Sequence, residues 1–232
     1  MHPIKPRQKE TIDEIRIYFD GSNNIVYALY AGGSYLVSPV TTTYAPSLGS
    51  WNNISMVRSG STVTIYFNGV GISSSSISGS FSNTDKLAIG TLLALTTTRN
   101  FNGYISNLRI NNTTALYTGT ESFTPSTTPL TAVSGTQLLT CQSNRFIDNS
   151  SNNLTITPNG SPSVQRFSPF NPTASYDTAT IGGSGYFDGS GDYLSVADAA
   201  GFTLGTNSFC VEAWVYPTSV SAGASQSIIG QW

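Results

Sequence analysis

The sequence predicts an all-β protein that folds as an antiparallel sandwich of two sheets. Short stretches in which apolar and polar residues alternate recur along its 232 residues, and turns rich in Gly, Asn, Asp and Ser separate them. No stretch shows the i, i+3, i+4 spacing of a long amphipathic helix. A chain of this length can bury a sizeable core, so we expect one sandwich.

The first half of the chain carries eight predicted strands, each bounded by turn residues. Asp20-Gly21 lies between two alternating runs and predicts a hairpin in which the glycine takes the positive φ that a tight reversal needs. Asn68-Gly69 predicts a second such reversal. The predicted strands are 15–19, 25–29, 34–37, 51–58, 62–67, 70–73, 86–89 and 101–111.

Two local features are predicted within these strands. In 101–111 the alternation set by Ile105 fails at Leu108 and Ile110, which predicts a β-bulge. The serine run 73–76 is expected at an exposed edge of a sheet and not in a linker.

The second half begins with an extended connector at 118–135, predicted from its prolines and its many Thr and Ser residues. The stretch 187–217 predicts two strands joined by a polar, glycine-bearing connection, and the second of them, 209–216, is the strongest predicted strand of the chain. Both faces of 209–216 are mostly apolar or aromatic, so we place it inside a sheet that is covered on two sides. The polar run 148–153 predicts a turn, and no regular structure is predicted for 162–172. The other predicted strands are 137–141, 154–157 and 179–187.

Composition argues against two classes of partner. Charged residues make up 9% of the chain and the net charge is -2, so no basic surface for nucleic acid and no polybasic membrane patch is expected. No apolar run approaches the roughly 20 residues that span a bilayer, so membrane insertion is not expected either. The basic segment 1–12 has no apolar stretch behind it, which predicts a terminal arm and no standard secretory signal.

Four segments carry a family resemblance. FDGSGDYLSV at 187–196, followed by FCVEAWVYP at 209–217, resembles the first half of a laminin-G-like, concanavalin-A-like jelly-roll domain. IYFNGV at 65–70 and FNGYISNLRI at 101–110 resemble the second half of the same family. The resemblance implies a jelly roll, a fold that hosts lectins, adhesion modules, structural proteins and glycosidases.

The order of these segments is reversed relative to the family. Segment 13–133 resembles the later half of the domain and precedes segment 134–232, which resembles the earlier half, so the resemblance implies a circularly permuted jelly roll. Each segment alone would leave the inner face of its sheets uncovered. We expect the two segments to close on each other within one chain, and residues 1–12 to form an arm that precedes them. Exchange with neighbouring subunits and an origin in a tandem array are the alternatives.

The sequence lacks the catalytic patterns that this fold can carry. Laminarinase-type relatives present Glu-x-Asp-x-x-Glu on one strand, a spacing that is missing here, although glycoside hydrolysis requires two carboxylates. The single histidine, His2, lies in the arm, where it cannot complete a catalytic set in a folded core. We therefore expect no enzyme. Cys141 and Cys210 are expected as buried free thiols, with a disulfide between them as the alternative.

Calcium is the one cofactor that the residues suggest. Asp188, Asp192 and Asp198 flank a glycine-rich turn, and carboxylate and carbonyl oxygens are the ligands that calcium takes. The resemblance implies a related site, because laminin-G-like and pentraxin-like domains often hold calcium on such loops. The alternative is that these aspartates only form turns at strand ends.

A sugar-binding surface would combine exposed aromatic rings with amides and hydroxyls, because a sugar ring has an apolar face and a rim of hydroxyls. Four aromatic residues near loops or at solvent-facing strand positions are the candidates, and packing in the core or at a sheet edge is the alternative for each. These residues are Tyr35, Tyr44, Trp51 and Tyr66.

Two further phrases point to a biological setting. LLTCQSNRF at 138–146 and QRFSPF at 165–170 resemble laminin-G-like modules of tail-fibre and other virion proteins of marine bacteriophages. The resemblance implies a non-catalytic virion or extracellular protein that binds host surface polysaccharide and assembles with other virion proteins or with copies of itself. A purely structural virion component and a polysaccharide hydrolase are the alternatives.

Overall fold

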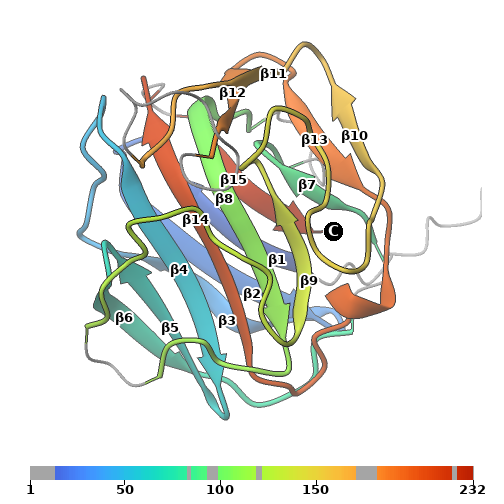
Figure 1. Cartoon of the computed structure of the whole chain (residues 1–232). Coiled ribbons are helices and arrows are strands. Elements are labelled where there is room, and N and C mark those ends of the chain that lie inside the picture. Colours follow the sequence, from blue (N-terminus) through green and yellow to red (C-terminus); the bar gives the residue numbers. More distant parts are fainter. Residues whose placement is uncertain are drawn as a thin grey trace, which may run out of the picture.

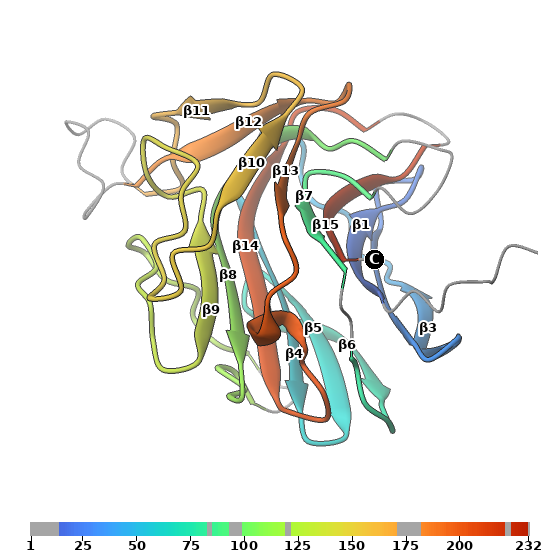
Figure 2. The same cartoon turned by 90° about the vertical axis from the view of Figure 1, so that its right-hand side faces the viewer.

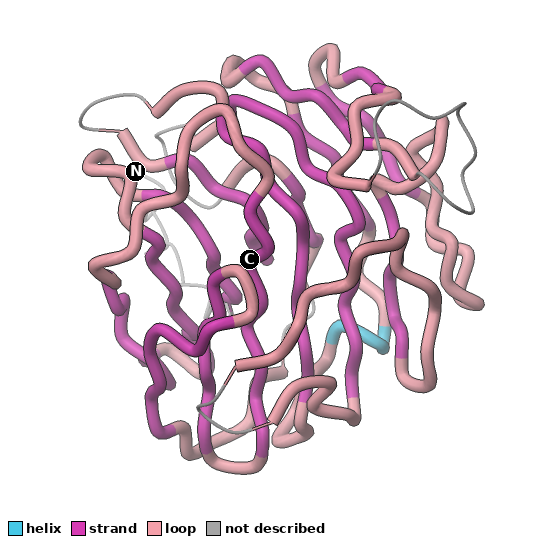
Figure 3. Tube along the Cα trace, turned by 60° about the vertical axis from the view of Figure 1, so that its left-hand side comes forward, coloured by secondary structure: helices cyan, strands magenta, loops and turns pink. Residues whose placement is uncertain are grey.

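Two β-sheets face each other and enclose one hydrophobic core. The computed structural model describes residues 14–82, 85–92, 99–118, 122–170, 182–220 and 224–231. Figure 2 shows the two sheets as separate layers, with β8, β14 and β4 in one and β7, β15 and β1 in the other. Within the described residues the one helical element is a 3-10 turn at Ala200–Phe202, drawn in cyan in Figure 3. The all-β sandwich is confirmed.

The first sheet, here called sheet A, has seven strands in the order β10-β13-β7-β15-β1-β2-β3. Every pair of neighbouring strands in this sheet is antiparallel. Its strands are β1 (Glu14–Phe19), β2 (Ile25–Ala31), β3 (Ser34–Thr41), β7 (Leu87–Ile89), β10 (Ile156–Asn159), β13 (Tyr193–Val196) and β15 (Gln226–Gln231).

The second sheet, here called sheet B, has the order β11-β12-β8-β14-β4-β5-β6, and β9 pairs with β8 beside this path. Figure 1 shows β8, β14 and β4 crossing the front of the molecule. Its strands are β4 (Asn52–Ser59), β5 (Thr62–Phe67), β6 (Val70–Ser76), β8 (Asn102–Asn112), β9 (Thr136–Thr140), β11 (Ser163–Gln165), β12 (Ser184–Asp188) and β14 (Phe209–Pro217).

Both segments of the chain contribute strands to both sheets. In sheet B, β14 lies between β8 and β4, and in sheet A, β15 lies between β7 and β1. Ile15 near the start of the described chain pairs with Gln231 near its end. In this structure 14–133 and 134–231 therefore form one sandwich, because neither completes a sheet without the other. The whole of the arm predicted at 1–12, and its junction with β1, lie outside the described residues.

Most predicted strands coincide with observed ones, and 62–67 matches β5 at both ends. The structure extends the strands predicted at 34–37 and 70–73, and it adds β11 and β15, which the sequence did not predict. Part of the strand predicted at 179–187 lies outside the described residues. The placement of 209–216 inside a sheet is confirmed by β14.

The predicted bulge in β8 is confirmed. Arg109 pairs with Glu212 of β14 and Ser106 pairs with Trp214, so β8 has one more residue than β14 over this interval. Asn107 takes a φ of 52° there and its side-chain oxygen accepts the N–H of Leu130. The bulge returns Leu108 and Ile110 to the core face, where both are buried.

Of the two predicted hairpin turns, the one at Asn68-Gly69 has the predicted backbone conformation and the one at Asp20-Gly21 does not. Asn68 and Gly69 both have positive φ, as a two-residue hairpin requires. At the first hairpin the prediction that Gly21 takes the positive φ is wrong, because Asn23 takes it, with a φ of 66°. The carboxylate of Asp20 accepts the backbone N–H groups of Ser22 and Asn24, and this holds the turn without a left-handed glycine.

The connector predicted at 118–135 is part of a segment, 113–135, that covers the outer face of sheet B without forming strands where it is described. Figure 1 shows this segment passing in front of β4 and β14. Ala115, Leu116, Tyr117 and Phe123 pack on a small cluster of buried residues on that face, formed by Val57, Tyr66 and Cys210.

The two cysteines lie on opposite faces of sheet B. Cys141 belongs to the core between the sheets, whereas Cys210 lies under the connector on the outer face. Both are buried free thiols, which confirms that prediction.

The described residues include no helix that is long and apolar enough to cross a membrane.

Candidate functional site

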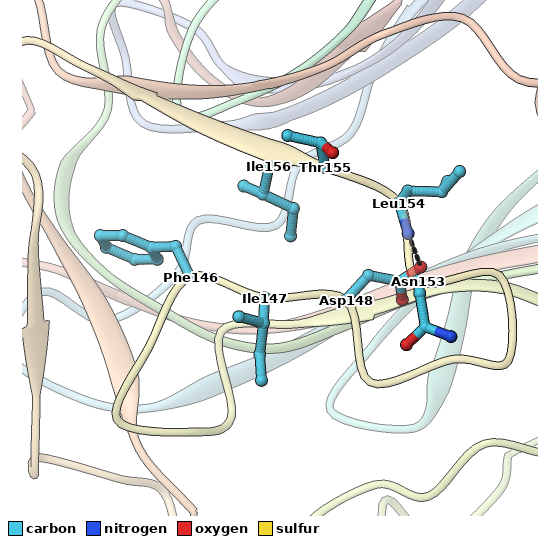
Figure 4. Close-up of a pocket in the computed structure, with 7 residues that line it drawn as sticks. All are labelled: Phe146, Ile147, Asp148, Asn153, Leu154, Thr155 and Ile156. Carbon is cyan, nitrogen blue, oxygen red and sulfur yellow. Dashed lines mark hydrogen bonds between the residues drawn. The ribbon is translucent and has the colours of Figure 1, made fainter.

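The described surface has a groove at the β10 edge of the sandwich, where the loop that follows β9 faces the start of β10. It has a volume of about 430 Å³, within the range of small-molecule sites. Figure 4 shows the loop and the strand on its two sides, with Ile156 directed into the space between them. The lining residues are Phe146, Ile147, Asp148, Asn153, Leu154, Thr155 and Ile156.

Asp148 holds the loop in shape. Its Oδ1 accepts the N–H groups of Leu139 at 3.1 Å and Ser150 at 2.8 Å, and its Oδ2 accepts the N–H of Leu154 at 2.9 Å. The Ser150 hydroxyl donates to the same Oδ2. Because these bonds join β9, the loop and the residue two positions before β10, Asp148 fixes the distance between the two sides of the groove (Figure 4). It is itself buried, so it serves as a brace and does not face a ligand.

The floor of the groove is apolar and its rim is polar. Phe146, Leu154 and Ile156 pack against the core, and Ile147 is 43% exposed. On the rim, the Thr155 hydroxyl has no hydrogen-bond partner among the described residues, and it is exposed. A hydroxyl beside an apolar floor can bind a ligand that has both an apolar face and hydroxyl groups.

A second hollow of about 240 Å³ lies on the other side of Leu154. Its lining includes Gln137, Asn152 and the 3-10 turn that contains Gly201. A Cβ on Gly201 would lie 2.0 Å from Oε1 of Gln137, so the glycine makes room for that amide. The two hollows share Leu154 and together offer an elongated site with amides at one end.

Acidic groups suited to catalysis are scarce in this site. Asp148 is the one carboxylate that lines either hollow within the described residues, and its oxygens are occupied by the bonds given above. Glu212, which lies alone on its strand in the sequence, pairs with Arg109 beneath the connector on the other face of sheet B. The described lining thus lacks the pair of carboxylates that glycoside hydrolysis uses.

The four predicted aromatic residues do not form one site. Tyr66 is 1% exposed and packs against Phe123 under the connector, so its prediction as a surface residue is wrong. Tyr35 on β3 is 44% exposed and meets Tyr30 edge-on, and Tyr44 is 43% exposed beside Phe67. Their rings lie near the edge of sheet A opposite the groove.

Trp51 lies in a half-buried aromatic cluster on the outer face of sheet B. Its ring centre is 5.2 Å from that of Phe167 and 5.5 Å from that of Tyr216. Tyr104 joins both, at 4.9 Å from Phe167 and 5.8 Å from Tyr216. The rings mostly meet edge-to-face, as in a packed cluster. Trp51 therefore packs among other rings, which is the alternative that the sequence left open for it.

The structure brings together two of the three predicted calcium ligands. Asp192 is buried, with Oδ1 accepting the N–H of Ser161 and Oδ2 that of Asp188. Asp198 follows β13 whereas Asp192 precedes it, so the two lie at opposite ends of that strand. The described residues contain no group of three or more His, Cys, Asp or Glu side chains that could hold a metal ion. The proposed set of three is therefore not assembled.

The sequence signalled the groove only in part. The polar run 148–153 was expected as a turn, and the structure places it in the bend between β9 and β10. What the sequence did not reveal is that Asp148 bonds to both neighbours of the bend, because those bonds join residues whose spatial proximity depends on the fold. The available signal was local: an aspartate side chain often accepts the backbone N–H two residues later, which here belongs to Ser150.

Comparison with known proteins supports the fold. Residues 4–116 match a family described as the concanavalin A-like lectin/glucanases superfamily, of laminin G type. A search of curated proteins and a search of solved structures each gave no match. The superfamily includes sugar binders and hydrolases, so the match is compatible with carbohydrate binding and does not separate the two. The groove lies outside the matched residues, which make up just under half of the chain.

Proposed function

We propose that the protein is a non-catalytic, carbohydrate-binding jelly roll that holds a short stretch of a surface polysaccharide in the groove between the β9 loop and β10. The observation that carries the proposal is the mixed lining of this groove, with an apolar floor and the exposed hydroxyl of Thr155 on its rim. We further propose a virion setting and a bacterial host surface as the source of the glycan; the support for both is the resemblance of 138–146 and 165–170 to modules of bacteriophage virion proteins.

The shape of the site favours a chain of sugars over a single one. The groove and the second hollow meet at Leu154, and Gln137 and Asn152 supply amides beyond it. Floor residues can contact the apolar face of a pyranose, while the Thr155 hydroxyl and Oδ1 of Asn152, whose Nδ2 is bonded to Gln137, bind its hydroxyls. Binding at one such site is expected to be weak, and several copies on one particle would raise the avidity.

A binding role is favoured over hydrolysis by the state of the acidic groups. The described lining of the site contains one carboxylate, and it braces the loop. A hydrolase would place a second carboxylate about 5–10 Å away, across the scissile bond.

The test is binding of the purified full chain to a panel of bacterial surface polysaccharides, with calcium and then with chelator. Thr155→Val removes the rim hydroxyl at nearly constant shape and is expected to weaken binding about five- to tenfold, the loss of one hydrogen bond. Thr62→Val is the matched control, because Thr62 is an exposed strand residue on β5, far from the groove.

The outcomes separate the candidate functions. Selective binding that Thr155→Val weakens and Thr62→Val leaves unchanged supports the proposal, and loss of binding with chelator adds a calcium ion near the site. Release of sugar from any polysaccharide overturns the non-catalytic assignment in favour of a hydrolase. If no polysaccharide binds, the proposal fails, and loss of particle assembly on deletion of residues 1–12 would then identify a structural component.

A further inference from the structure

The chain has a long stretch that is almost free of charge. Between Asp20 and Asp85 the one charged residue is Arg58. Arg58 is buried, and its guanidinium donates to the backbone oxygens of Gly60, Gly79 and Gly205. Strands β2 to β6 and their loops therefore present a neutral surface wherever they are exposed.

Two edge strands of this stretch lie on the same side of the sandwich. β3 ends sheet A and β6 ends sheet B. The Tyr27 hydroxyl, on the strand next to β3, lies 3.1 Å from Ser73 Oγ and 2.9 Å from Ser75 Oγ of β6. Figure 2 shows β3 and β6 close to each other. We call the surface formed by β3, β6 and the loop 42–50 the β3/β6 wall.

Proteins usually protect the edges of sheets, and three of the four strands that end the two described sheet orders are protected. β3 contains Pro39 and β10 contains Pro158, neither of which can donate a backbone hydrogen bond, and β11 has three residues. β6 has seven residues with no proline and no charge. Its register shifts once, around Ile72, and after that the serines of 73–76 pair regularly with β5. This strand can accept a further strand.

Exposed apolar side chains gather on the same wall. Seven large apolar side chains are exposed among the described residues, and four of them lie between Asp20 and Asp85. Tyr35 is on β3, Val70 is on β6, and Tyr44 and Leu48 are in the loop 42–50. Tyr44 packs beside Phe67, which pairs with Val70, so these rings continue the surface of β6.

We propose that the β3/β6 wall is the interface of a two-fold symmetric homodimer, in which the β6 strands of two copies pair antiparallel. A two-fold axis brings each surface against its own copy. If the wall carried exposed charges of one sign, the walls of two copies would repel each other. This wall carries no charged residue, so two copies can meet without electrostatic repulsion. The small serine side chains of 73–76 allow two backbones to approach.

The dimer would point its two grooves in opposite directions. The groove lies at the β10 edge of sheet A, and β3 is the opposite edge of that sheet. Dimerisation through the wall thus leaves both grooves open. The dimer does not depend on the glycan proposal, since it follows from the edge strands and their charge, but it would supply the second binding site that avidity requires.

Sedimentation velocity of the full-length chain tests the interface over a range of micromolar concentrations. The wild type is expected as a dimer. Val70→Lys combined with Ser76→Lys places four positive charges at the two-fold interface and is expected to give a monomer. Val164→Lys is the matched control, because Val164 is exposed on the opposite edge strand β11, and this variant is expected to remain a dimer.

Circular dichroism and thermal unfolding verify that each variant is folded before its mass is interpreted. Hydrogen exchange adds a readout in the wild type, because the amides of β6 are expected to lose protection on dilution. A wild type that is monomeric throughout the range would overturn the proposal. So would a folded Val70→Lys/Ser76→Lys variant that remains a dimer, since its interface would then lie elsewhere.

Discussion

The guanidinium of Arg109 on β8 binds the carboxylate of Glu212 on β14 through two nitrogens, with Nε at 2.9 Å and Nη2 at 2.6 Å from the same oxygen, Oε1. The other oxygen of Glu212 accepts the Tyr117 hydroxyl at 2.9 Å, and Nη1 of Arg109 donates to the carbonyl of Thr131. Tyr117 and Thr131 belong to the connector 113–135. The ion pair therefore ties two points of the connector to the outer face of sheet B.

Removal of the cation should destabilise the protein strongly. Arg109→Met leaves the buried Glu212 carboxylate without its partner, and loss of one member of a buried pair costs about 3–5 kcal/mol. The free energy of unfolding measured by urea denaturation checks this value. The Tyr117 phenol next to the carboxylate has its pKa raised by burial and by the Glu212 charge, so it stays protonated and keeps donating.

The double variant Arg109→Met/Glu212→Leu is the control for this prediction. It removes both charges and leaves an apolar face under Tyr117, so it should be more stable than Arg109→Met alone. A single variant that loses less than about 1 kcal/mol, the range of an exposed pair, would show that water reaches the pair despite the connector.

The positions of most strands could be predicted from the sequence, but the order of the strands in the two sheets could not. Alternation identifies β5, a run of aromatic and β-branched residues identifies β14, and the failure of alternation at Leu108 identifies the bulge in β8, because these patterns are local. The position of β14 between β8 and β4 is not local, since it depends on which faces close the core. β15 was missed because its six residues are all buried and show no alternation.

The candidate site was harder to predict than the fold for a related reason. The predicted aromatic residues were chosen as exposed, but exposure depends on what covers each face, and the connector covers Tyr66. The groove itself is made by bonds of Asp148 to residues on both of its sides. The bond of Asp148 to Ser150 is local, but its bonds to Leu139 and Leu154 and the cover over Tyr66 have no signature in a short stretch of sequence.

Neither cysteine should react in the folded protein. Burial raises the pKa of the Cys141 thiol to about 12, and burial together with the Glu212 charge raises that of Cys210 well above its usual range. Both are therefore protonated and inaccessible at pH 8. Titration with a thiol-specific chromogenic reagent should detect no thiol under native conditions and both in denaturant. If only one thiol, or neither, appears in denaturant, the two are not both free.

The first hairpin should contribute a pH-dependent stability through Asp20. Slight burial opposes ionisation of this carboxyl, but the hydrogen bonds from Asn24 and Ser22 outweigh it and lower the pKa. A lowered pKa in the folded state stabilises above the unfolded value of about 4 and loses this effect as the pH falls through the folded value. Asp20→Asn should thus be less stable than wild type at pH 7, and the difference should shrink in acid.

Urea denaturation of the two proteins at pH 7 and near pH 3 measures this difference. A gap between wild type and Asp20→Asn that stays constant from neutral to acid pH would contradict the prediction, since it would mean that the shape of the side chain and not its charge holds the turn.

The brace of the groove should matter for both folding and binding. Asp148→Ala leaves the N–H groups of Leu139, Ser150 and Leu154 without their acceptor, and each buried unpaired donor costs up to about 1–3 kcal/mol, less where water can enter. We expect a loss of about 2–4 kcal/mol in the free energy of unfolding, because some of these donors would be hydrated. Asp198→Ala, at an exposed aspartate, should change it by less than about 0.5 kcal/mol.

Binding distinguishes a brace from a ligand contact. Because Asp148 spaces the loop from β10 and does not face the groove, Asp148→Ala should weaken polysaccharide binding even in buffer where the variant is fully folded, and it should also raise hydrogen exchange at Leu154. If binding falls while exchange at Leu154 is unchanged, Asp148 contacts the ligand directly. If exchange rises while binding is unchanged, the glycan does not occupy this groove, and the elongated site beside Leu154 is not where the protein holds its ligand.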